Sequence, residues 1–447
     1  MLTGQLILYY KKKILSSIYE LVFFNNNFLI KNKIFYIFTT KYILKSHIII
    51  CYTVINKIYI KKEIFPMARF ILNETSYFGA GSRENLATEI AKRGYNKAFI
   101  VADKDLISFG IVELVTNVIS EFPYEIFSDF KANPTVNNVK AGVEAYKASG
   151  ADFVIAIGGG SAIDTAKAIA IIINNPEFSD VVSLEGVADT KNKCVDIIAL
   201  PTTAGTAAEV TINYVITDEE SGRKMVCVDP NDIPVLAIVD ADLMATMPAG
   251  LTAATGMDAL THAIEGYITK GAWELSNILE INAIAIISNN LRNATFNGRD
   301  MYAREQMALG QYVAGMAFSN VGLGCVHSMA HPLGARFDIA HGVANALLLP
   351  IVMEFNMPAC KAKYCRIASA MGVNVAGMTE DEGAMAAVEA VKKLSIDLGI
   401  PQTLREIGIP EEALEQLASD AFSDVCTGGN PREITEADIL ELYRKAY

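Results

Sequence analysis

The stretch Phe153-Val-Ile-Ala-Ile-Gly-Gly-Gly-Ser161 predicts a buried β-strand that turns directly into a helix. Apolar and β-branched residues form the strand at Phe153–Ile157, and the helical pattern Ala162–Asn174 follows the glycines. Glycines let a backbone approach a phosphate closely, and a helix start offers free N–H groups at the positive end of its dipole. We expect Ser161 to be the N-cap, with Asp164 at the capping-box position. The turn suits a nucleotide phosphate, although a well-capped turn without a ligand has the same composition.

Similar units surround this turn and predict an α/β fold. Further buried strands are expected at Lys97–Ala102, Val195–Leu200 and Val235–Val239, and another helix at Ala141–Ser149. Strands that alternate with helices form βαβ units, so residues 67–248 should be a dinucleotide-binding domain with a doubly wound parallel sheet.

From Pro248 onward, strand patterns almost vanish and helical patterns follow one another. They cover Thr252–Thr269, Glu274–Leu291, Tyr302–Ala317, Lys361–Met371 and Asp381–Leu398. With 447 residues the chain is long enough for two domains. Residues 249–447 should therefore form an all-helical second domain.

Polar residues follow two of the predicted strands. Asp103 comes directly after Lys97–Ala102, where an acidic side chain can accept hydrogen bonds from a ribose 2′-OH. It precedes the glycines, whereas the usual dinucleotide fingerprint places the acid about twenty residues after them. Pro201-Thr-Thr-Ala-Gly-Thr206, with Glu209 beyond, follows the strand Val195–Leu200 and suits a cofactor crevice. Solvated loop residues remain the alternative at both places.

Four of the five histidines lie within eighty residues: His262, His327, His331 and His341. Asp258 and His262 are four residues apart, as are His327 and His331, so each pair would project from one face of a helix. We expect Pro332 and Gly334 to end the helix before His341 is reached. The clustering indicates one site, although any single histidine could be an ordinary core or surface residue.

The residue types in this cluster indicate the metal. Asp258, His262, His327 and His341 offer one carboxylate and three imidazoles, which suit Fe(II) or Zn(II) and are too rich in nitrogen for Mg²⁺ or Ca²⁺. The ligand chemistry does not separate iron from zinc. His331 is a fifth candidate, either as a proton relay beside the substrate or outside the ligand set.

Charge and cysteine content limit the class of protein. A net charge of −12 argues against a nucleic-acid partner, because phosphate neutralisation needs a basic surface. Seven scattered cysteines without a CxxC pair predict reduced thiols in a cytoplasmic protein.

Residues 1–66 differ in composition from the rest of the chain. Ile, Lys, Tyr, Phe and Asn supply 42 of these 66 residues, there is no Ala, and the segment carries a charge of +8. Lys and Asn interrupt every apolar run, which argues against a membrane span. The segment also lacks the small-residue cleavage site of a secretory signal and the Arg of a transit peptide. We expect a mis-assigned start, with the product beginning at Met67. The mass of the natively expressed protein tests this.

With these residues in hand, the chain from Met67 to Tyr447 resembles the iron-containing, or group III, alcohol dehydrogenases. The resemblance rests on motifs around Gly158–Asp164, Pro201–Glu209, Gly256–Glu265, Gly324–Gly334 and Cys426–Arg432. It implies that the metal ligands are Asp258, His262, His327 and His341, and that NAD contacts Asp103, Asn133, Gly160, Ser161, Thr202, Thr203 and Lys224. It also implies metal-assisted hydride transfer on small alcohols and aldehydes, most like the subgroup that interconverts lactaldehyde and 1,2-propanediol, in a homodimer.

One departure and two alternatives accompany the resemblance. The family usually has proline before the last histidine ligand, whereas this chain has Ala340 before His341; the ligand is kept, so we expect metal binding to survive. A dehydroquinate-synthase-like lyase would need a cluster of Arg and Lys near the metal, but residues 324–345 offer only Arg336. In a non-catalytic metal-binding protein, the nucleotide-binding turn would have no function.

Overall fold

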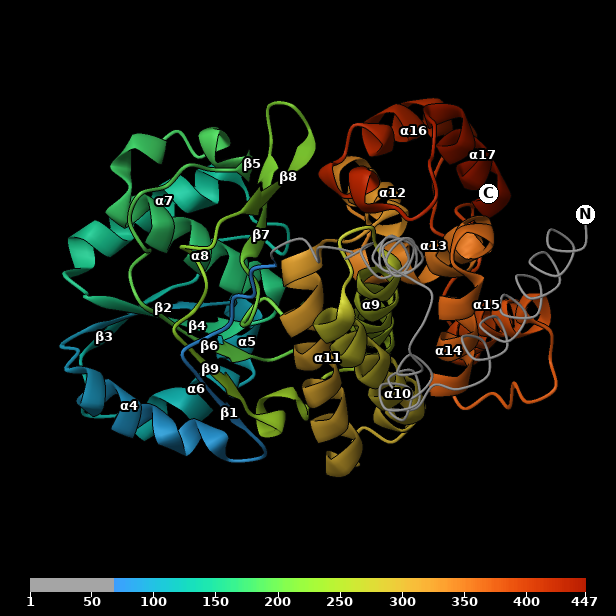
Figure 1. The fold of residues 1–447 in the computed structure, drawn as a ribbon. Coiled ribbons are helices and arrows are strands. Elements are labelled where there is room, and N and C mark those ends of the chain that lie inside the picture. Colours follow the sequence, from blue (N-terminus) through green and yellow to red (C-terminus); the bar gives the residue numbers. More distant parts are fainter. Residues whose placement is uncertain (1–67) are drawn as a thin grey trace, which may run out of the picture. The chain divides into compact units, whose positions relative to one another are not determined.

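The computed structural model describes residues 68–447, so the extension 1–66 and the expected start at Met67 lie outside the described residues. A six-stranded sheet forms in the first half of this part (Figure 1). Its strands are β1 (Thr75–Phe78), β2 (Ala98–Ala102), β3 (Tyr124–Phe127), β4 (Phe153–Gly158), β6 (Ile197–Pro201) and β9 (Leu236–Val239). They lie in the order β1-β9-β6-β4-β2-β3, and every neighbouring pair is parallel. The predicted parallel α/β sheet is confirmed.

Helices cover both faces of this sheet because its central strands are apolar on both sides. In β4, Val154 and Ala156 pack into one core with residues of α7 and α8, whereas Phe153, Ile155 and Ile157 pack into the other with residues of α4 and α6 (Figure 1). The helices of this part are α4 (Leu86–Arg93), α5 (Lys104–Ser108), α6 (Ile111–Thr116), α7 (Val136–Ser149) and α8 (Gly160–Asn174). The sheet is therefore doubly wound.

A second sheet was not expected from the sequence. It contains β5 (Gly186–Val187), β7 (Asn213–Asp218) and β8 (Arg223–Val228). Strands β7 and β8 form an antiparallel hairpin, and β5 pairs with β8 in parallel. Buried and half-buried side chains alternate along β7, so it lacks the continuous apolar run that marks the strands of the main sheet.

The second half of the described chain is helical, as predicted. Its helices are α9 (Ala249–Ile268), α10 (Glu274–Phe296), α11 (Met301–Val321), α12 (Cys325–Phe337), α13 (His341–Asn356), α14 (Lys361–Ala370), α15 (Glu380–Asp397), α16 (Leu414–Phe422) and α17 (Glu436–Ala446). Helix α9 is buried along nearly its whole length, between α10, α11 and α13. Residues Arg69–Tyr447 form one compact unit. A domain boundary at residues 248–249 stays a prediction.

The helix was expected to break at Pro332 and Gly334, before His341. It does end before His341, but the break does not lie at these two residues. Helix α12 contains Pro332 and continues to Phe337. Proline removes one hydrogen bond from a helix interior, but this segment is buried from Cys325 to Gly334, and packing holds it helical. The helix ends instead at Asp338, whose φ of 54° is left-handed. The turn Asp338–Ala340 then leads into α13, which begins at His341.

One helical segment of the described chain, His341–Ala359, is long and apolar enough to match the length and composition of a membrane span. More than half of its most apolar window, 56 %, is buried inside the protein. Core helices commonly have this composition. The expectation of a protein without a membrane partner stays a prediction.

A buried carboxyl group in the helical half gives the protein a testable pH dependence. Glu280 of α10 is fully buried against Gly266 of α9, and among residues 68–447 neither of its carboxyl oxygens has a hydrogen-bond partner. Burial raises the pKa of Glu280 well above its ordinary value of 4.5. An acid with a raised folded-state pKa contributes stability that is fully present below pH 4.5 and is lost as the pH rises through the folded pKa.

We therefore expect Glu280→Gln to leave stability little changed at pH 5 and to raise it, relative to the wild type, by about 1–3 kcal/mol at pH 8. Urea unfolding at the two pH values measures the difference. Glu274→Gln, at an exposed position of the same helix, is the control and should run parallel to the wild type. If the stability of the Glu280 variant had the same pH dependence as that of the wild type, the prediction would be contradicted.

Candidate metal and cofactor site

The cofactor crevice lies where the order of the parallel strands reverses. After β2 the chain proceeds to the outer strand β3, and after β4 it proceeds to β6 on the opposite side. Strands β2 and β4 are hydrogen-bonded neighbours, and Asp103 and Gly158–Ser161 follow their carboxyl ends. In open parallel sheets, ligands bind outside the carboxyl ends of strands at such a switch point.

The glycine turn approaches the crevice closely because it carries no side chains there. A Cβ added at Gly159 would lie 3.1 Å from Thr203 Oγ1, and one added at Gly160 would lie 2.9 Å from Thr206 Cγ2. Helix α8 begins at Gly160, and its N-cap Gly159 has no side chain that could bond the first N–H groups. These N–H groups are therefore available to an anion at the positive end of the helix dipole.

The predicted capping box was wrong. Because α8 begins one residue before Ser161, the Ser161 hydroxyl lies inside the first turn and donates to the Ala132 carbonyl instead. Asp164 accepts a hydrogen bond of 3.1 Å from the backbone N–H of Val215 and so joins α8 to β7.

The other expected NAD contacts divide into two groups. Lys224 Nζ donates to Asn133 Oδ1 at 3.0 Å, and Asn133 Nδ2 donates to Asp338 Oδ1 at 2.6 Å, so this group joins β8 to the end of α12. Burial lowers the pKa of Lys224, and three carboxylates nearby oppose that shift. Asp103, Thr202 and Thr203 lie outside the cavity lining. Asp103 caps α5 by accepting from Asp105 N at 2.7 Å, and Thr202 is buried.

A single cavity of about 430 Å³ joins the glycine turn to the histidine cluster. Its lining includes the predicted residues Asn133, Gly160, Ser161, Lys224, Asp258, His262, His327, His331 and His341. The structure therefore brings nine of the twelve predicted site residues to one cavity.

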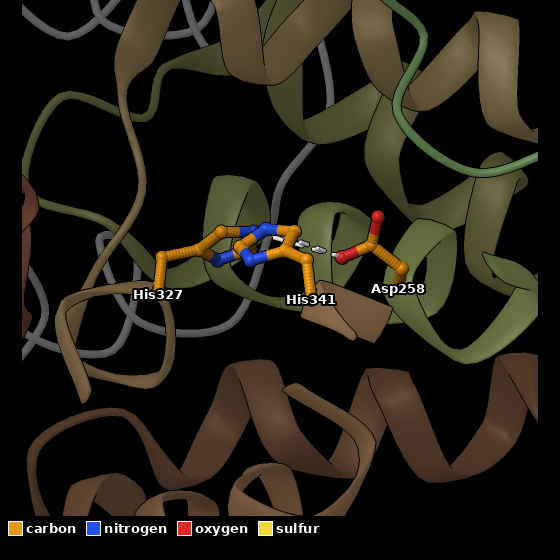
Figure 2. A group of neighbouring side chains, drawn as sticks. All are labelled: Asp258, His327 and His341. Atoms are coloured by element: carbon orange, nitrogen blue, oxygen red, sulfur yellow. Dashed lines mark ion pairs between the residues drawn. The ribbon is translucent and has the colours of Figure 1, made fainter. Parts of the chain in front are cut away.

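Three of the four expected ligands converge within this cavity (Figure 2). Asp258 comes from α9, His327 from α12 and His341 from the first residue of α13. Asp258 Oδ1 lies 4.0 Å from His327 Nε2 and 3.8 Å from His341 Nε2. Their three ligand atoms all lie within 4.8 Å of one another. The carboxylate and His327 are buried, whereas the His341 side chain is 28 % exposed toward the cavity.

His262 lies beside these three residues, one helical turn after Asp258. Its Nδ1 is 4.0 Å from Asp258 Oδ2, and its ring lies 4.5 Å from the His327 ring. This nitrogen is buried and has no hydrogen-bond partner in the described chain. Burial lowers the pKa of both His262 and His327 to about 4, so both rings are neutral at physiological pH.

The donor set fits a divalent transition metal. Neutral imidazoles and one carboxylate are the ligands that Fe(II) and Zn(II) accept. Metal–ligand bonds of about 2.1 Å place tetrahedral ligand atoms about 3.4 Å apart. The separations of 3.8 and 4.0 Å from Asp258 Oδ1 would therefore need to shorten by about half an ångström. A metal bound nearby would also relieve the unfavourable burial of His262 Nδ1, because a buried polar atom without a partner is unfavourable.

Sequence reasoning missed the residue that orients His327. His327 Nδ1 lies 2.6 Å from Glu265 Oε2. Glu265 also accepts hydrogen bonds from the backbone N–H groups of Val326, at 2.7 Å, and His327. A proton held on Nδ1 leaves the Nε2 lone pair directed at Asp258 and His341, as in the carboxylate–histidine–metal arrangement of other metal sites. Glu265 stood in a family motif, but nothing in the sequence indicated its partner.

His331 has a similar partner that the sequence did not reveal. Its Nδ1 donates to Asp424 Oδ2 at 2.7 Å. Burial pushes the pKa of Asp424 upward, but its contact with His331 and the backbone N–H of Cys426 outweigh burial and lower the pKa to about 2. The ionised carboxylate therefore holds the proton on Nδ1. The ring lines the cavity, 5.5 Å from the His341 ring and stacked on it.

A glycine at the start of α13 positions His341 and gives a sharp prediction. A Cβ added at Gly342 would lie 2.4 Å from the Ala254 carbonyl oxygen, a backbone atom of α9. Gly342→Ala should therefore push His341 away from Asp258 and weaken metal affinity about tenfold. Titration against a chelator of known affinity measures the change. Gly250→Ala is the control, because nothing lies within 4 Å of an added Cβ there; equal affinities of all three proteins would contradict the prediction.

A dinucleotide-type crevice that opens onto a buried Asp–His cluster is typical of metal-dependent nicotinamide enzymes, which include both oxidoreductases and the lyases considered above. Comparison with known proteins narrows the class. Residues 73–241 match the family model described as iron-containing alcohol dehydrogenase, and residues 252–447 match the C-terminal model of the same family. The chain belongs to the iron-containing alcohol dehydrogenase family and is an oxidoreductase of small alcohols and aldehydes. This assignment disfavours both the lyase and the non-catalytic alternative.

Individual relatives support this assignment. The chain is 57 % identical to lactaldehyde reductase of Escherichia coli K12 over 381 residues, which cover 85 % of this chain and 99 % of the relative. A crystal structure of 1,3-propanediol oxidoreductase superposes with a TM-score of 0.83 at 38 % identity, covering 85 % of this chain and all of that one. Sulfoacetaldehyde reductase from Bifidobacterium kashiwanohense, solved in complex with NAD⁺, superposes with a TM-score of 0.76 at 30 % identity, covering 85 % and 98 %.

Proposed function

We propose that this enzyme interconverts lactaldehyde and 1,2-propanediol with NAD(H) as the hydride carrier and Fe(II) as the metal. The observation that carries the proposal is the cavity in which Asp258, His327 and His341 converge beside the glycine turn of α8. The similarity to lactaldehyde reductase supports the substrate. Zn(II) remains the alternative metal, because the ligand types suit both ions.

Asp258, His262, His327 and His341 are the proposed metal ligands. The bound metal would supply Lewis acidity to an oxygen atom of the substrate. The protein contributes neutral imidazoles, since burial holds the pKa values of His262 and His327 near 4. Glu265 holds His327 in the tautomer that frees Nε2 for this task.

Asp103, Asn133, Gly160, Ser161, Thr202, Thr203 and Lys224 are the proposed NAD contacts. The first N–H groups of α8 suit the pyrophosphate, and the Asp103 carboxylate beyond β2 suits a ribose 2′-OH and disfavours a 2′-phosphate. Lys224 and Asn133, already bonded to each other, line the same cavity as Asp164 and Ser161. Asp258 and the histidines line this cavity too, so a bound nicotinamide would share it with them.

His331 is the proposed carrier of the substrate's hydroxyl proton. Bound NAD would supply the acceptor for the hydride that leaves the alcohol's C–H bond on oxidation, and His331 Nε2 would take up the O–H proton that is released with it. That nitrogen is free because Nδ1–H donates to Asp424. Reduction of the aldehyde returns the proton along the same path.

The cavity walls favour a small substrate. Phe318 stacks on His262, with ring centroids 4.2 Å apart, and lines the cavity together with Leu323 and Cys426. These side chains line the same cavity as the proposed ligands, and they suit the apolar part of a short-chain substrate. The enzyme is proposed to act as a cytoplasmic homodimer, as the family resemblance and the reduced cysteines suggest.

Oxidation of NADH by the metal-reconstituted enzyme tests the proposal. We expect kcat/KM to be highest with lactaldehyde, lower with propanal and butanal, and dependent on added Fe(II). The same series with Zn(II) and with NADPH identifies the metal and cofactor. Equal rates without metal, or no rate with any of the aldehydes, would reject the proposal. Size-exclusion chromatography with light scattering determines the oligomeric state.

A further inference from the structure

Asn345 is a buried amide that touches three of the four proposed metal ligands. It lies on α13, one helical turn after His341, and is fully buried. Its Nδ2 donates to Asp258 Oδ1 at 2.7 Å and lies 3.1 Å from His341 Nε2 and 3.2 Å from His327 Nε2. Neither the sequence motifs nor the proposed ligand set assigns this residue a role.

The acceptor atoms determine how this amide is oriented. An ionised carboxylate only accepts hydrogen bonds, so the amide nitrogen, and not its oxygen, must face Asp258. An NH₂ group has two hydrogens and here meets three acceptors. The carboxylate contact is the shortest and is charge-assisted, so it takes one hydrogen, and the two ring nitrogens compete for the other. Asp258 is therefore the principal partner of Asn345.

No other described side chain or backbone group donates a hydrogen bond to the Asp258 carboxylate. His327 has Glu265 as its orienting partner. Asn345 occupies the corresponding place for Asp258, and it also lies on the helix that begins with His341. One side chain thus connects Asp258, on α9, with the helix that begins with His341.

The other end of the amide argues against a purely packing role. Asn345 Oδ1 is buried and has no hydrogen-bond partner in the described chain. A buried acceptor without a partner is unfavourable, and an apolar side chain of similar size would avoid it. The unfavourable burial of Asn345 Oδ1 therefore indicates that the residue is needed as the hydrogen-bond donor to Asp258.

We propose that Asn345 is a positioning residue of the metal centre, which holds the Asp258 carboxylate in place and thereby sets the affinity for the metal. The inference rests on the ligand set proposed above. Partners that orient metal ligands commonly change metal affinity 10- to 100-fold when they are removed. We expect a loss of this size in Asn345→Leu, which keeps the approximate shape and removes the donor.

The experiment compares this variant with a matched control on the same helix. Asn356 is also buried on α13, but its amide exchanges two hydrogen bonds of 2.8 Å with Asn430 and contacts none of the proposed ligands. Asn356→Leu therefore removes a buried amide from α13 without touching Asp258. Zn²⁺ affinity is measured on the full-length protein by competition with a chelator of known affinity, and folding is checked by circular dichroism and melting temperature.

Asn345→Leu should bind Zn²⁺ 10- to 100-fold more weakly than the wild type, while Asn356→Leu stays within about threefold. Loading with Co²⁺ gives a second measurement, since its visible absorption reports ligand geometry and should change only in the Asn345 variant. Equal affinities of wild type and Asn345→Leu, or equal losses in both variants, would overturn the proposal. If the leucine variant does not fold, Asn345→Ser is used, and an unchanged affinity has the same meaning.

The same titration separates this inference from the proposed function. A wild type that binds no Zn²⁺ at a 1:1 ratio would reject the ligand set itself. If the wild type binds Zn²⁺ and the Asn345 variant binds it with equal affinity, only the role of Asn345 is rejected.

Discussion

The Asp258→Asn enzyme is expected to lose about 10³-fold in kcat/KM, equivalent to about 4 kcal/mol of transition-state stabilisation, together with most of its bound metal. Asp258 is the only charged member of the proposed ligand set, and it lies 3.8 and 4.0 Å from the ligand atoms of His341 and His327. Asparagine keeps the shape of the side chain but removes the negative charge. It also replaces the charge-assisted hydrogen bond from Asn345 with a weaker bond between two neutral amides. Elemental analysis after desalting gives the metal content, and NADH oxidation gives kcat/KM.

Asp397→Asn is the control for the loss of one carboxylate in the helical half. Asp397 pairs with Arg292 at 2.8 Å at a partly exposed position on α15. This variant should keep both metal and activity. Full metal content and wild-type kcat/KM in the Asp258 variant would show that the metal is held elsewhere.

Asp424→Asn is expected to lower the rate of alcohol oxidation about 10²-fold at neutral pH while metal content is unchanged. The Asp424 carboxylate, ionised because its pKa is about 2, holds the proton of His331 on Nδ1. An asparagine can instead turn its NH₂ toward Nδ1, which moves the ring proton to Nε2. That nitrogen then cannot accept the substrate's proton, as in a Ser-His-Asp triad whose aspartate is replaced by asparagine. The loss should shrink at high pH, where hydroxide takes the proton directly.

The neighbouring Asp420→Asn variant is the matched control. Asp420 lies on α16 close to Asp424, but it pairs with Arg336 and not with His331. Its pH–rate profile should match that of the wild type. If the profiles of both variants match the wild type, His331 has no role in proton transfer. If both are altered equally, the effect is one of local packing.

The amino-acid sequence alone was enough for the parts of the protein that depend on local pattern. Strands β2, β4, β6 and β9 are buried on both faces, so they appear as unbroken apolar runs that end in turn residues. Asp258 and His262 share a face of α9 because helical spacing requires it. The residue types were also enough to predict the class of metal, because three imidazoles and a carboxylate restrict the choice of ion wherever they lie in the chain.

Predictions from the local sequence were wrong where tertiary packing outweighed local conformational preference. Proline disfavours a helix interior, yet α12 continues through Pro332 because its neighbours are buried. Serine is a good N-cap, yet α8 begins at Gly160 and its N-cap is Gly159, two residues before Ser161. The glycines there lie close against Thr203 and Thr206. The hairpin β7–β8, which supplies Lys224 to the cavity, alternates in burial and lacks a strong apolar run.

Only the tertiary structure revealed the residues that orient the reactive groups. Glu265, Asn345 and Asp424 contact His327, Asp258 and His331 across 62, 87 and 93 residues of sequence. A carboxylate or amide in a single sequence carries no sign of a partner so far away, because the contact depends on how α9, α12, α13 and the segment after α16 pack together. The sequence alone therefore determined which groups could bind a metal and a nucleotide. The fold determined which atom of each group is free to do so, since burial and hydrogen bonds set the tautomer of each imidazole and the position of the carboxylate.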